Sequence, residues 1–277
     1  MNASQPRSGW LSQLLWYLPV LLILAFFTFP LIWILMTALK PPIDVFAYPP
    51  KFVFTPTLDN YRRVLASDYM GSLANSVIIA LTSAVFSVVL GTLTAYGFSR
   101  YPLRGKDNLF FWILSLRMLP VIAVIVPYFL LFQRIALTDT LLAMILVYSV
   151  FNISFTVWLL KGFFDEVPRE MEEAAKMDGY GPWGVFTRVA LPLVIPGIAT
   201  AMVFNVVQSI NEFLLAFVLT QRKATTAPIA LLNFLTPMGL DWGGISAAAS
   251  MLVVPVIILA ILVRKHLIRG MSFGQLE

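Results

Sequence analysis

Residues 166–196 read EVPREMEEAAKMDGYGPWGVFTRVALPLVIP and form the one substantial charged insertion in an otherwise apolar chain. The segment is acidic at its start, has a helical pattern, and lies between two long apolar runs. Six such runs dominate the sequence, so a polar segment between two of them needs a role of its own. We infer that it docks a soluble partner onto a membrane-embedded body.

Composition places the chain among membrane proteins. Its 277 residues are 59% hydrophobic and 12% charged, with a mean hydropathy of +0.85, far from soluble globular usage. The net charge of +5 is not gathered into a basic cluster, so it does not indicate nucleic-acid binding and instead fits charges that orient membrane helices. The absence of cysteine excludes disulfides, thiol catalysis and cysteine-ligated metals, and leaves the redox compartment undecided.

The six apolar runs predict an all-α membrane protein with six spanning helices, because roughly 20 apolar residues cross a bilayer. The runs cover approximately residues 14–39, 71–98, 108–132, 140–163, 193–219 and 244–263. They define a transmembrane domain over 14–263, a polar N-terminal tail at 1–13 and a C-terminal tail at 264–277. The second run is rich in Ser, Thr, Ala and Gly, which predicts a helix packed closely inside the bundle.

Six spans place both termini on one side of the membrane, and charge indicates which side. With the termini in the cytoplasm, eleven lysines and arginines lie inside and seven outside. The short basic loop 99–107 and the basic start of the C-terminal tail point inward most clearly. We therefore expect N-in, C-in topology with extracytoplasmic loops at 40–70 and 221–243, the first containing a short helix at 58–66.

Residues 165–192 predict a helix, a tight turn and a second helix at the cytoplasmic surface. Asp165 is the expected N-cap, and Gly179 breaks the first helix. The expected apolar stripe consists of Val167, Met171, Ala174 and Ala175. The alternative is a helix lying on lipid. However, five acidic residues between 165 and 173 accompany only Arg169, so anionic lipid would repel this helix and a groove on a protein is the better partner.

The spacing within this segment is the most specific signal in the sequence. It reads, in order, Glu173-Ala174-Ala175, three residues, Gly179, nine residues, Val189, one residue, and Leu191-Pro192. This pattern resembles the EAA loop of ABC-importer permeases, EAA-x3-G-x9-I-x-LP, with a conservative valine for isoleucine. Three further segments resemble the carbohydrate-uptake branch, close to the second membrane subunit of maltose-type transporters. They are VPREMEEAAKMDG at 167–179, NEFLLAFVLT at 211–220 and RKHLIRG at 264–270.

The resemblance implies a type I importer permease fold with a cytoplasmic coupling helix. It also implies a heterodimer with a second permease subunit, two ATPase subunits and an extracytoplasmic solute-binding protein, importing a sugar or polyol across the inner membrane of a prokaryote. The EAA helix of that family sits in a cleft of the ATPase, so ATP and magnesium belong to the partner, and this chain is expected to be no enzyme and to bind no cofactor. The implied coupling residues are Glu173, Ala174, Ala175, Asp178, Gly179, Leu191 and Pro192.

Ionisable residues inside the apolar runs indicate a transport pathway by default, and Arg117 and Glu212 are the two that lie away from the ends of a run. At about 1.5 Å per residue, Arg117 lies roughly 15 Å and Glu212 roughly 30 Å from the cytoplasmic starts of their spans, which argues against a direct ion pair unless tilt or a kink at Pro120 narrows the gap. Neutral amides nearby suit the hydroxyls of a sugar, or alternatively hydrogen-bond between helices. The expected pathway residues are Arg117, Asn152, Asn205, Gln208, Asn211 and Glu212.

A self-sufficient secondary transporter driven by an ion gradient is the rival interpretation. It predicts inverted repeats and an acidic relay in the membrane, whereas no repeat is visible and Glu212 is the one acidic residue inside the spans. A membrane-embedded enzyme is less well supported, because no nucleophile and base are arranged together and no P-loop occurs. The single histidine, His266, lies in the basic tail and predicts no metal site.

Overall fold

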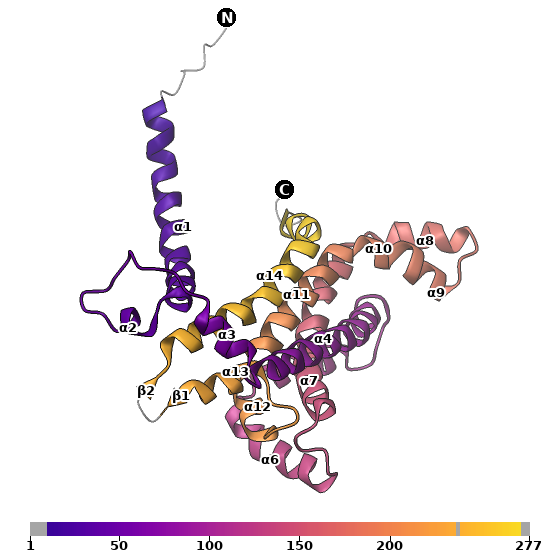
Figure 1. Ribbon diagram of the computed structural model, residues 1–277. Helices are drawn as coiled ribbons and strands as arrows, with labels where there is room; N and C mark the ends of the chain where they lie inside the picture. Colours follow the sequence, from indigo (N-terminus) through magenta and orange to yellow (C-terminus); the bar gives the residue numbers. More distant parts are fainter. Residues whose placement is uncertain (1–9, 237–238, 273–277) are drawn as a thin grey trace, which may run out of the picture. The chain divides into compact units, whose positions relative to one another are not determined.

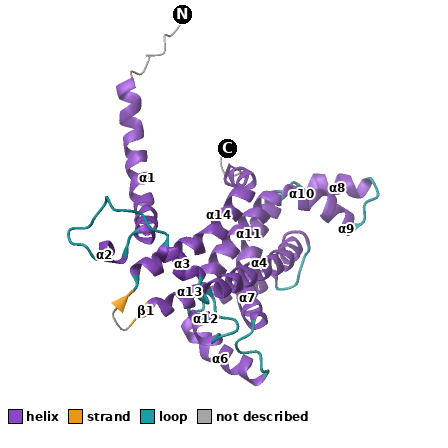
Figure 2. Cartoon of the chain, viewed as in Figure 1, coloured by secondary structure: helices purple, strands orange, loops and turns teal. Residues whose placement is uncertain are grey.

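The computed structural model describes residues 10–236 and 239–272, and helices make up most of this part of the chain (Figure 2). The chain divides into two compact units, residues 1–67 with 234–251 and residues 68–233 with 252–277. The expectations for the chain ends, residues 1–9 and 273–277, lie outside the described residues, as does the side chain of His266.

The first unit combines long and short helices with a small antiparallel ribbon. Its elements are α1 (Trp10–Leu39), α2 (Pro42–Val45), α3 (Asp59–Leu65), β1 (Leu235–Thr236), β2 (Gly239–Leu240) and the start of α14 (Trp242–Ser272). The short helix expected at 58–66 is confirmed as α3. Asn60 on α3 donates to the carbonyls of Ala38 and Lys40, 2.8 and 2.9 Å away, and Arg63 forms an ion pair with Asp241 at 2.9 Å. These bonds tie the proline-rich loop to the end of α1 and the start of α14.

α1 presents its apolar side chains outward. None of its most apolar segment is buried by the chain, and Phe26 and Phe27 are 75% and 70% exposed. A helix that is hydrophobic all round and unburied is suited to lipid or to another membrane protein.

The second unit is built around α4 (Tyr69–Arg100), α7 (Leu141–Glu166) and α11 (Ile195–Asn211), which pack on one another (Figure 1). The helices that follow α4 and flank α7 are α5 (Lys106–Met118), α6 (Val121–Arg134), α8 (Arg169–Met177) and α9 (Pro182–Val185). The remaining elements are the π-helix η1 (Phe186–Ala190), α10 (Leu191–Leu193), α12 (Leu214–Leu219), α13 (Ala227–Ala230) and the 3-10 helix η2 (Leu231–Phe234).

Small residues allow α4 and α7 to approach closely. A Cβ added at Gly91 of α4 would lie 2.5 Å from the side chain of Thr156 on α7, so no larger residue fits there without a shift. The hydroxyl of Ser87 also donates across this interface to the carbonyl of Ser149 at 3.3 Å. The prediction that the second apolar run packs inside the bundle is confirmed.

In the described part of the chain, four helices are long and apolar enough to cross a membrane, and the number rises to six if each of two bent helix pairs counts as one span. α5 and α6 meet at a bend of 93°, and the helix over 182–193 meets α11 at 72°. The expected spans at 108–132 and 193–219 are each interrupted, the first at Leu119 and the second at Glu212.

The break at Leu119 has a local cause. Leu119 precedes Pro120, and a residue before proline is pushed out of the helical region, so Leu119 adopts φ −66° and ψ 123°. Glu212 has a similar extended backbone, φ −71° and ψ 128°, between α11 and α12. Broken helices at membrane depth persist where the freed backbone groups face protein or a cavity, so these two breaks are the first places to look for a pathway.

Candidate functional site

α8 is the helix that contains the Glu-Ala-Ala sequence. It begins at Arg169 after Pro168, which has no N–H to satisfy. The prediction that Asp165 is its N-cap is wrong: Asp165 lies in the last turn of α7, where it accepts a 2.6 Å hydrogen bond from the hydroxyl of Ser99 and pairs with Lys161. The extended backbone of Val167 separates the two helices.

Gly179 ends α8 as predicted. It has φ +87°, a left-handed conformation that favours glycine, and the next N–H, of Tyr180, donates to the carbonyl of Ala175 at 3.1 Å. The chain then turns back at Gly181 into α9, and Figure 1 shows α8 and α9 lying next to each other.

Adjacent glutamates on α8 have opposite surroundings. Glu172 is 3% exposed, and its Oε1 lies 2.7 Å from Nε of Arg100 at the end of α4. Its Oε2 accepts a 3.0 Å hydrogen bond from the hydroxyl of Tyr96. Glu173, in contrast, is exposed. α8 is therefore fixed to α4 through Glu172, while Glu173 remains free to meet another protein.

The apolar stripe expected on α8 is only half right. Val167 and Ala175 are buried, but Met171 is 46% exposed and Ala174 is exposed as well. The face of α8 that packs on the rest of the chain contains Glu172 in place of Met171 and Ala174. An acidic residue fits there because Arg100 reaches it and also donates from Nη2 to the carbonyl of Val167 at 2.9 Å, which satisfies the break between α7 and α8.

Sequence reasoning missed Arg100, Tyr96 and Glu172. Arg100 was counted only as a charge that orients the membrane helices. The available signal was its position as the last residue of a long apolar run, facing an acid-rich segment that follows another such run. A buried ion pair of this kind is costly to break from one side, so it makes a firm attachment between α8 and the membrane helices.

The end of the loop joins the same packed region. Leu191 packs against a buried cluster from α4, α7 and η1, whereas Pro192 and Asp178 are exposed. The π-helix η1 ends at Ala190, two residues before Pro192, which cannot donate a helical hydrogen bond.

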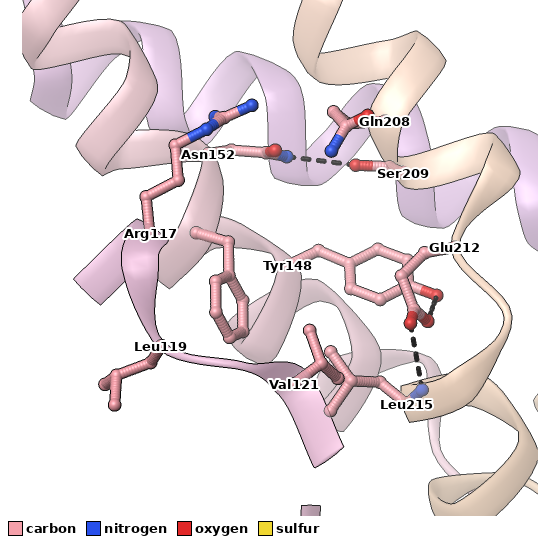
Figure 3. A pocket seen from close by; sticks show the side chains of 10 residues that line it. Arg117, Leu119, Val121, Tyr148, Asn152, Gln208, Ser209, Glu212 and Leu215 are labelled. Atoms are coloured by element: carbon pink, nitrogen blue, oxygen red, sulfur yellow. Dashed lines mark hydrogen bonds between the residues drawn. The ribbon is translucent and has the colours of Figure 1, made fainter. Parts of the chain in front are cut away.

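The two helix breaks meet at one cavity of about 190 Å³ (Figure 3). Its wall combines charged, amide, hydroxyl and aromatic groups, and its lining residues are Arg117, Leu119, Val121, Tyr148, Phe151, Asn152, Gln208, Ser209, Glu212 and Leu215. Arg117 also lines a second cavity of about 330 Å³ beside Phe155 and Trp158.

Glu212 is held in place by three donors. Its Oε1 accepts from the N–H of Leu215 at 3.0 Å, and its Oε2 accepts from the N–H of Ala216 at 3.2 Å and from the hydroxyl of Tyr148 at 2.9 Å. The carboxylate therefore satisfies the first N–H groups of α12.

Arg117 has no such partner. Its guanidinium lies over the ring of Phe155, 4.6 Å from the centroid, and no described residue forms a hydrogen bond or ion pair with it. The prediction that Arg117 and Glu212 form no direct ion pair is confirmed for the described part of the chain. Both residues nevertheless line one cavity, as expected if a kink at Pro120 narrows the gap in depth, and the helices do break at Leu119 and at Glu212.

Comparison with known proteins assigns the chain to a family. Residues 87–273 match the model of the binding-protein-dependent transport system inner membrane component. The chain belongs to this family. The permease is also 34% identical, over the whole of both chains, to a probable ABC transporter permease protein of Sinorhizobium fredii. It is 34% identical to the trehalose transport system permease protein SugB of Mycobacterium tuberculosis, with 92% of the permease and 94% of SugB covered.

A solved structure shares the fold of the permease. A chain in the crystal structure of a bacterial ABC transporter involved in the import of the acidic polysaccharide alginate superposes with a TM-score of 0.77 at 21% identity, covering 96% of the permease and 100% of that chain. These findings favour an importer permease over a self-sufficient ion-coupled transporter.

The predicted pathway amides divide into two groups. Asn152 and Gln208 line the cavity of the permease with Arg117 and Glu212, and Asn152 also donates to the hydroxyl of Ser209 at 2.9 Å. Asn205 and Asn211 do not line it. Asn205 is buried and donates to Thr156 on α7 at 2.9 Å, so the alternative of interhelical bonding describes it better. Asn211 is exposed and donates to the carbonyl of Val207.

Asp139 is a further carboxylate that sequence reasoning treated only as part of a turn. It lies between α6 and α7 and accepts hydrogen bonds from the backbone N–H groups of Gln221, Arg222, Lys223 and Ala224. Burial raises the pKa of Asp139, but these four bonds outweigh it and hold the pKa below its ordinary value. Asp139 thus clamps the loop after α12. In residues 10–236 and 239–272, no group of three His, Cys, Asp or Glu side chains is placed to hold a metal.

Proposed function

We propose that this permease forms half of the pathway of an ABC importer for a sugar or polyol and is driven by a separate ATPase. Several relatives support this solute class by name: the permease is 34% identical to a trehalose permease and 28% identical to the trehalose/maltose permease MalG of Thermococcus litoralis. The complex contains a second permease, two ATPases that bind ATP and magnesium, and an extracytoplasmic solute-binding protein. The permease crosses the prokaryotic inner membrane six times, with both termini in the cytoplasm.

The observation that carries the coupling proposal is the division of the two glutamates on α8. Glu172 forms a buried ion pair with Arg100 inside the chain, while Glu173 and Ala174 are exposed. An exposed acidic residue beside small ones allows a partner with a basic groove to approach closely. Because α8 is fixed to α4 by a buried ion pair, movement of the ATPase at α8 passes to the membrane helices and switches the pathway between inward-open and outward-open states.

The cavity supplies the solute pathway. Its amides, hydroxyls and aromatic rings match the alternating polar and apolar faces of a saccharide. Arg117, Asn152, Gln208 and Glu212 are the residues that contact the solute or line its route. Asn205 bonds α11 to α7 instead, and Asn211 bonds only within α11.

Transport by the reconstituted complex tests the proposal. We expect uptake of a radiolabelled disaccharide into proteoliposomes to require both ATPase and ATP, and to continue when an uncoupler removes the ion gradient. Uptake that persists without ATPase and collapses with the uncoupler would contradict it.

A matched pair of variants tests the docking surface within the same assay. Glu173→Lys reverses the exposed charge and should weaken ATPase co-purification by roughly thirtyfold, since an interfacial charge contributes about 2 kcal/mol or more. Glu170→Lys reverses another exposed charge on the same helix, outside the Glu-Ala-Ala sequence, and serves as the control. Equal effects of the two variants, or none from Glu173→Lys, would remove the docking role.

A further inference from the structure

The two charges of the cavity are not equivalent. The carboxylate of Glu212 accepts from Tyr148, Leu215 and Ala216, so both of its oxygens are engaged within the chain. These donors stabilise its negative charge where it is. Glu212 therefore supports the shape of the wall more than it attracts a cation.

Arg117 retains its full hydrogen-bonding capacity. A guanidinium carries five N–H donors and is always charged in proteins. The ring of Phe155 covers one face of the group but accepts none of these N–H bonds in the plane of the guanidinium. Among residues 10–236 and 239–272 no carboxylate lies within ion-pair distance of Arg117. The guanidinium of Arg117 thus has no counter-ion among the described residues, and the carboxylate of Glu212 in the same cavity is held by its own neutral donors.

Neutral groups surround this charge on the side where a solute would meet it. Figure 3 shows the guanidinium of Arg117 on the same side as the amides of Asn152 and Gln208, while Glu212 is turned toward Tyr148 and Leu215. Gln208 is exposed, and its amide has no hydrogen-bond partner among the described residues. A free guanidinium beside a free amide can bind an anionic oxygen group and a neighbouring hydroxyl together.

We propose that the cavity binds an anionic group of the transported solute through Arg117, which makes the cargo an acidic saccharide bearing a carboxylate or a sulfonate. This inference rests on the proposed function, because it names the class of sugar that is transported through this cavity. It differs from binding of a neutral sugar, for which Arg117 would supply only one donor among several. It also differs from an ion pair between Arg117 and a second permease, which would neutralise the cavity in the complex.

The absence of cysteine from the chain allows a direct test in the assembled importer. Gln208→Cys places one thiol in the cavity, and its modification is followed by mass spectrometry of this chain with two methanethiosulfonate reagents, one ending in a sulfonate and one in a trimethylammonium. The ratio of the two rates cancels differences in access. We expect the sulfonate reagent to react faster, on the order of tenfold, because one unpaired charge lies nearby.

Variants at Arg117 test whether this residue causes the faster reaction of the sulfonate reagent. Arg117→Gln in the Gln208→Cys background should bring the ratio close to one, and Arg117→Lys should retain it. Ser209→Cys provides a second thiol position in case Gln208→Cys does not assemble. A ratio near one with Arg117 present, a preference for the cation, or a ratio that does not respond to Arg117→Gln would each overturn the proposal.

Protection of the same thiol tests the saccharide class. Glucuronate should slow modification by a neutral maleimide several-fold more than glucose does, and Arg117→Gln should abolish the difference. Equal protection by the two sugars, or protection by neither, would overturn the proposal. Because ATP-driven uptake is measured separately, failure of either thiol experiment leaves the permease function standing, whereas failure of uptake removes the proposed function itself.

Discussion

Two regions of the molecule each bring one arginine and one glutamate close together, and the roles of the two charges differ between them. One region is the coupling loop, residues 165–192, where it packs on the end of α4, and the other is the cavity. In the loop, Arg100 and Glu172 form a buried ion pair at 2.7 Å. In the cavity, Glu212 is satisfied by its own surroundings and Arg117 has no partner among the described residues. The paired charges hold two helices together, whereas the unpaired charge is available to bind a solute transiently. The pairing of a charge, more than its position in an apolar run, separates a structural residue from a candidate binding residue.

Breaking the pair in the loop should have the largest effect. Arg100→Ala leaves the carboxylate of Glu172 buried without its cation, which should lower the free energy of unfolding by about 3–5 kcal/mol. Thermal unfolding of the purified permease, followed by intrinsic fluorescence, measures the change.

The exchange of both charges provides the control for that variant. Arg100→Glu combined with Glu172→Arg should recover part of the lost stability and of the ATP-driven uptake. If Arg100→Ala is as stable as the unmodified chain, α8 is not held by this pair, and the contrast between the two regions fails.

Removing the satisfied carboxylate of the cavity should have an intermediate effect. Glu212→Ala deprives α12 of its capping oxygens and Tyr148 of its acceptor, which should destabilise the permease by about 1–2 kcal/mol. Glu212→Gln, which keeps an acceptor oxygen, should lose less in the same unfolding assay. An equal loss for glutamine and alanine would mean that the charge, and not the capping oxygen, is what matters.

Asp139 extends the contrast to a carboxylate engaged only by backbone N–H groups. Because its pKa is lower in the folded chain than the ordinary value of 3.8, its contribution to stability is complete above that value and is lost as the pH falls through the lowered pKa. Asp139→Asn should reduce stability at neutral pH and flatten its decline below about pH 4. Unfolding curves recorded from pH 6 to pH 3 compare the two chains, and an unchanged acid slope in the variant would contradict the clamp.

The smallest effect on stability is expected at Arg117. Arg117→Gln removes no hydrogen bond or ion pair to a described residue, so the free energy of unfolding should change by no more than about 0.5 kcal/mol, while solute transport changes. Unfolding and uptake measured on the same preparation separate the two. Destabilisation comparable to that of Arg100→Ala would make Arg117 a structural residue as well.

Much of the coupling loop could be predicted from its residues. The turn at Gly179 follows from its freedom to adopt positive φ, and the spacing from Glu173 to Pro192 led to the permease family. The partner of Glu172 could not be read in this way, because Arg100 is 72 residues distant in sequence and only the packing of α8 against α4 brings them together.

The cavity was harder to predict than the loop. Arg117, Asn152, Gln208 and Glu212 were identified as polar residues in apolar runs, and the cavity does contain all four. A kink at Pro120 was allowed for but not required, because a proline can be tolerated within a membrane helix. The break at Glu212 was missed because nothing in the residues around it forbids a helix. Whether Asn205 bonds to a solute or to Thr156 depends on how α11 is rotated about its own axis. The local sequence pattern does not determine that rotation.

Cross-linking from two adjacent alanines tests the central claim, docking of the ATPase on the outer face of α8, most directly. Ala174 is exposed and Ala175 is 6% exposed, so Ala174→Cys and Ala175→Cys place otherwise identical thiols on the exposed and the buried face of one helix in a cysteine-free chain. With a short thiol-reactive photo-crosslinker in the assembled complex, Ala174→Cys should yield a permease–ATPase adduct and Ala175→Cys should yield little. Adducts of equal yield from both positions, or none from Ala174→Cys, would contradict the account.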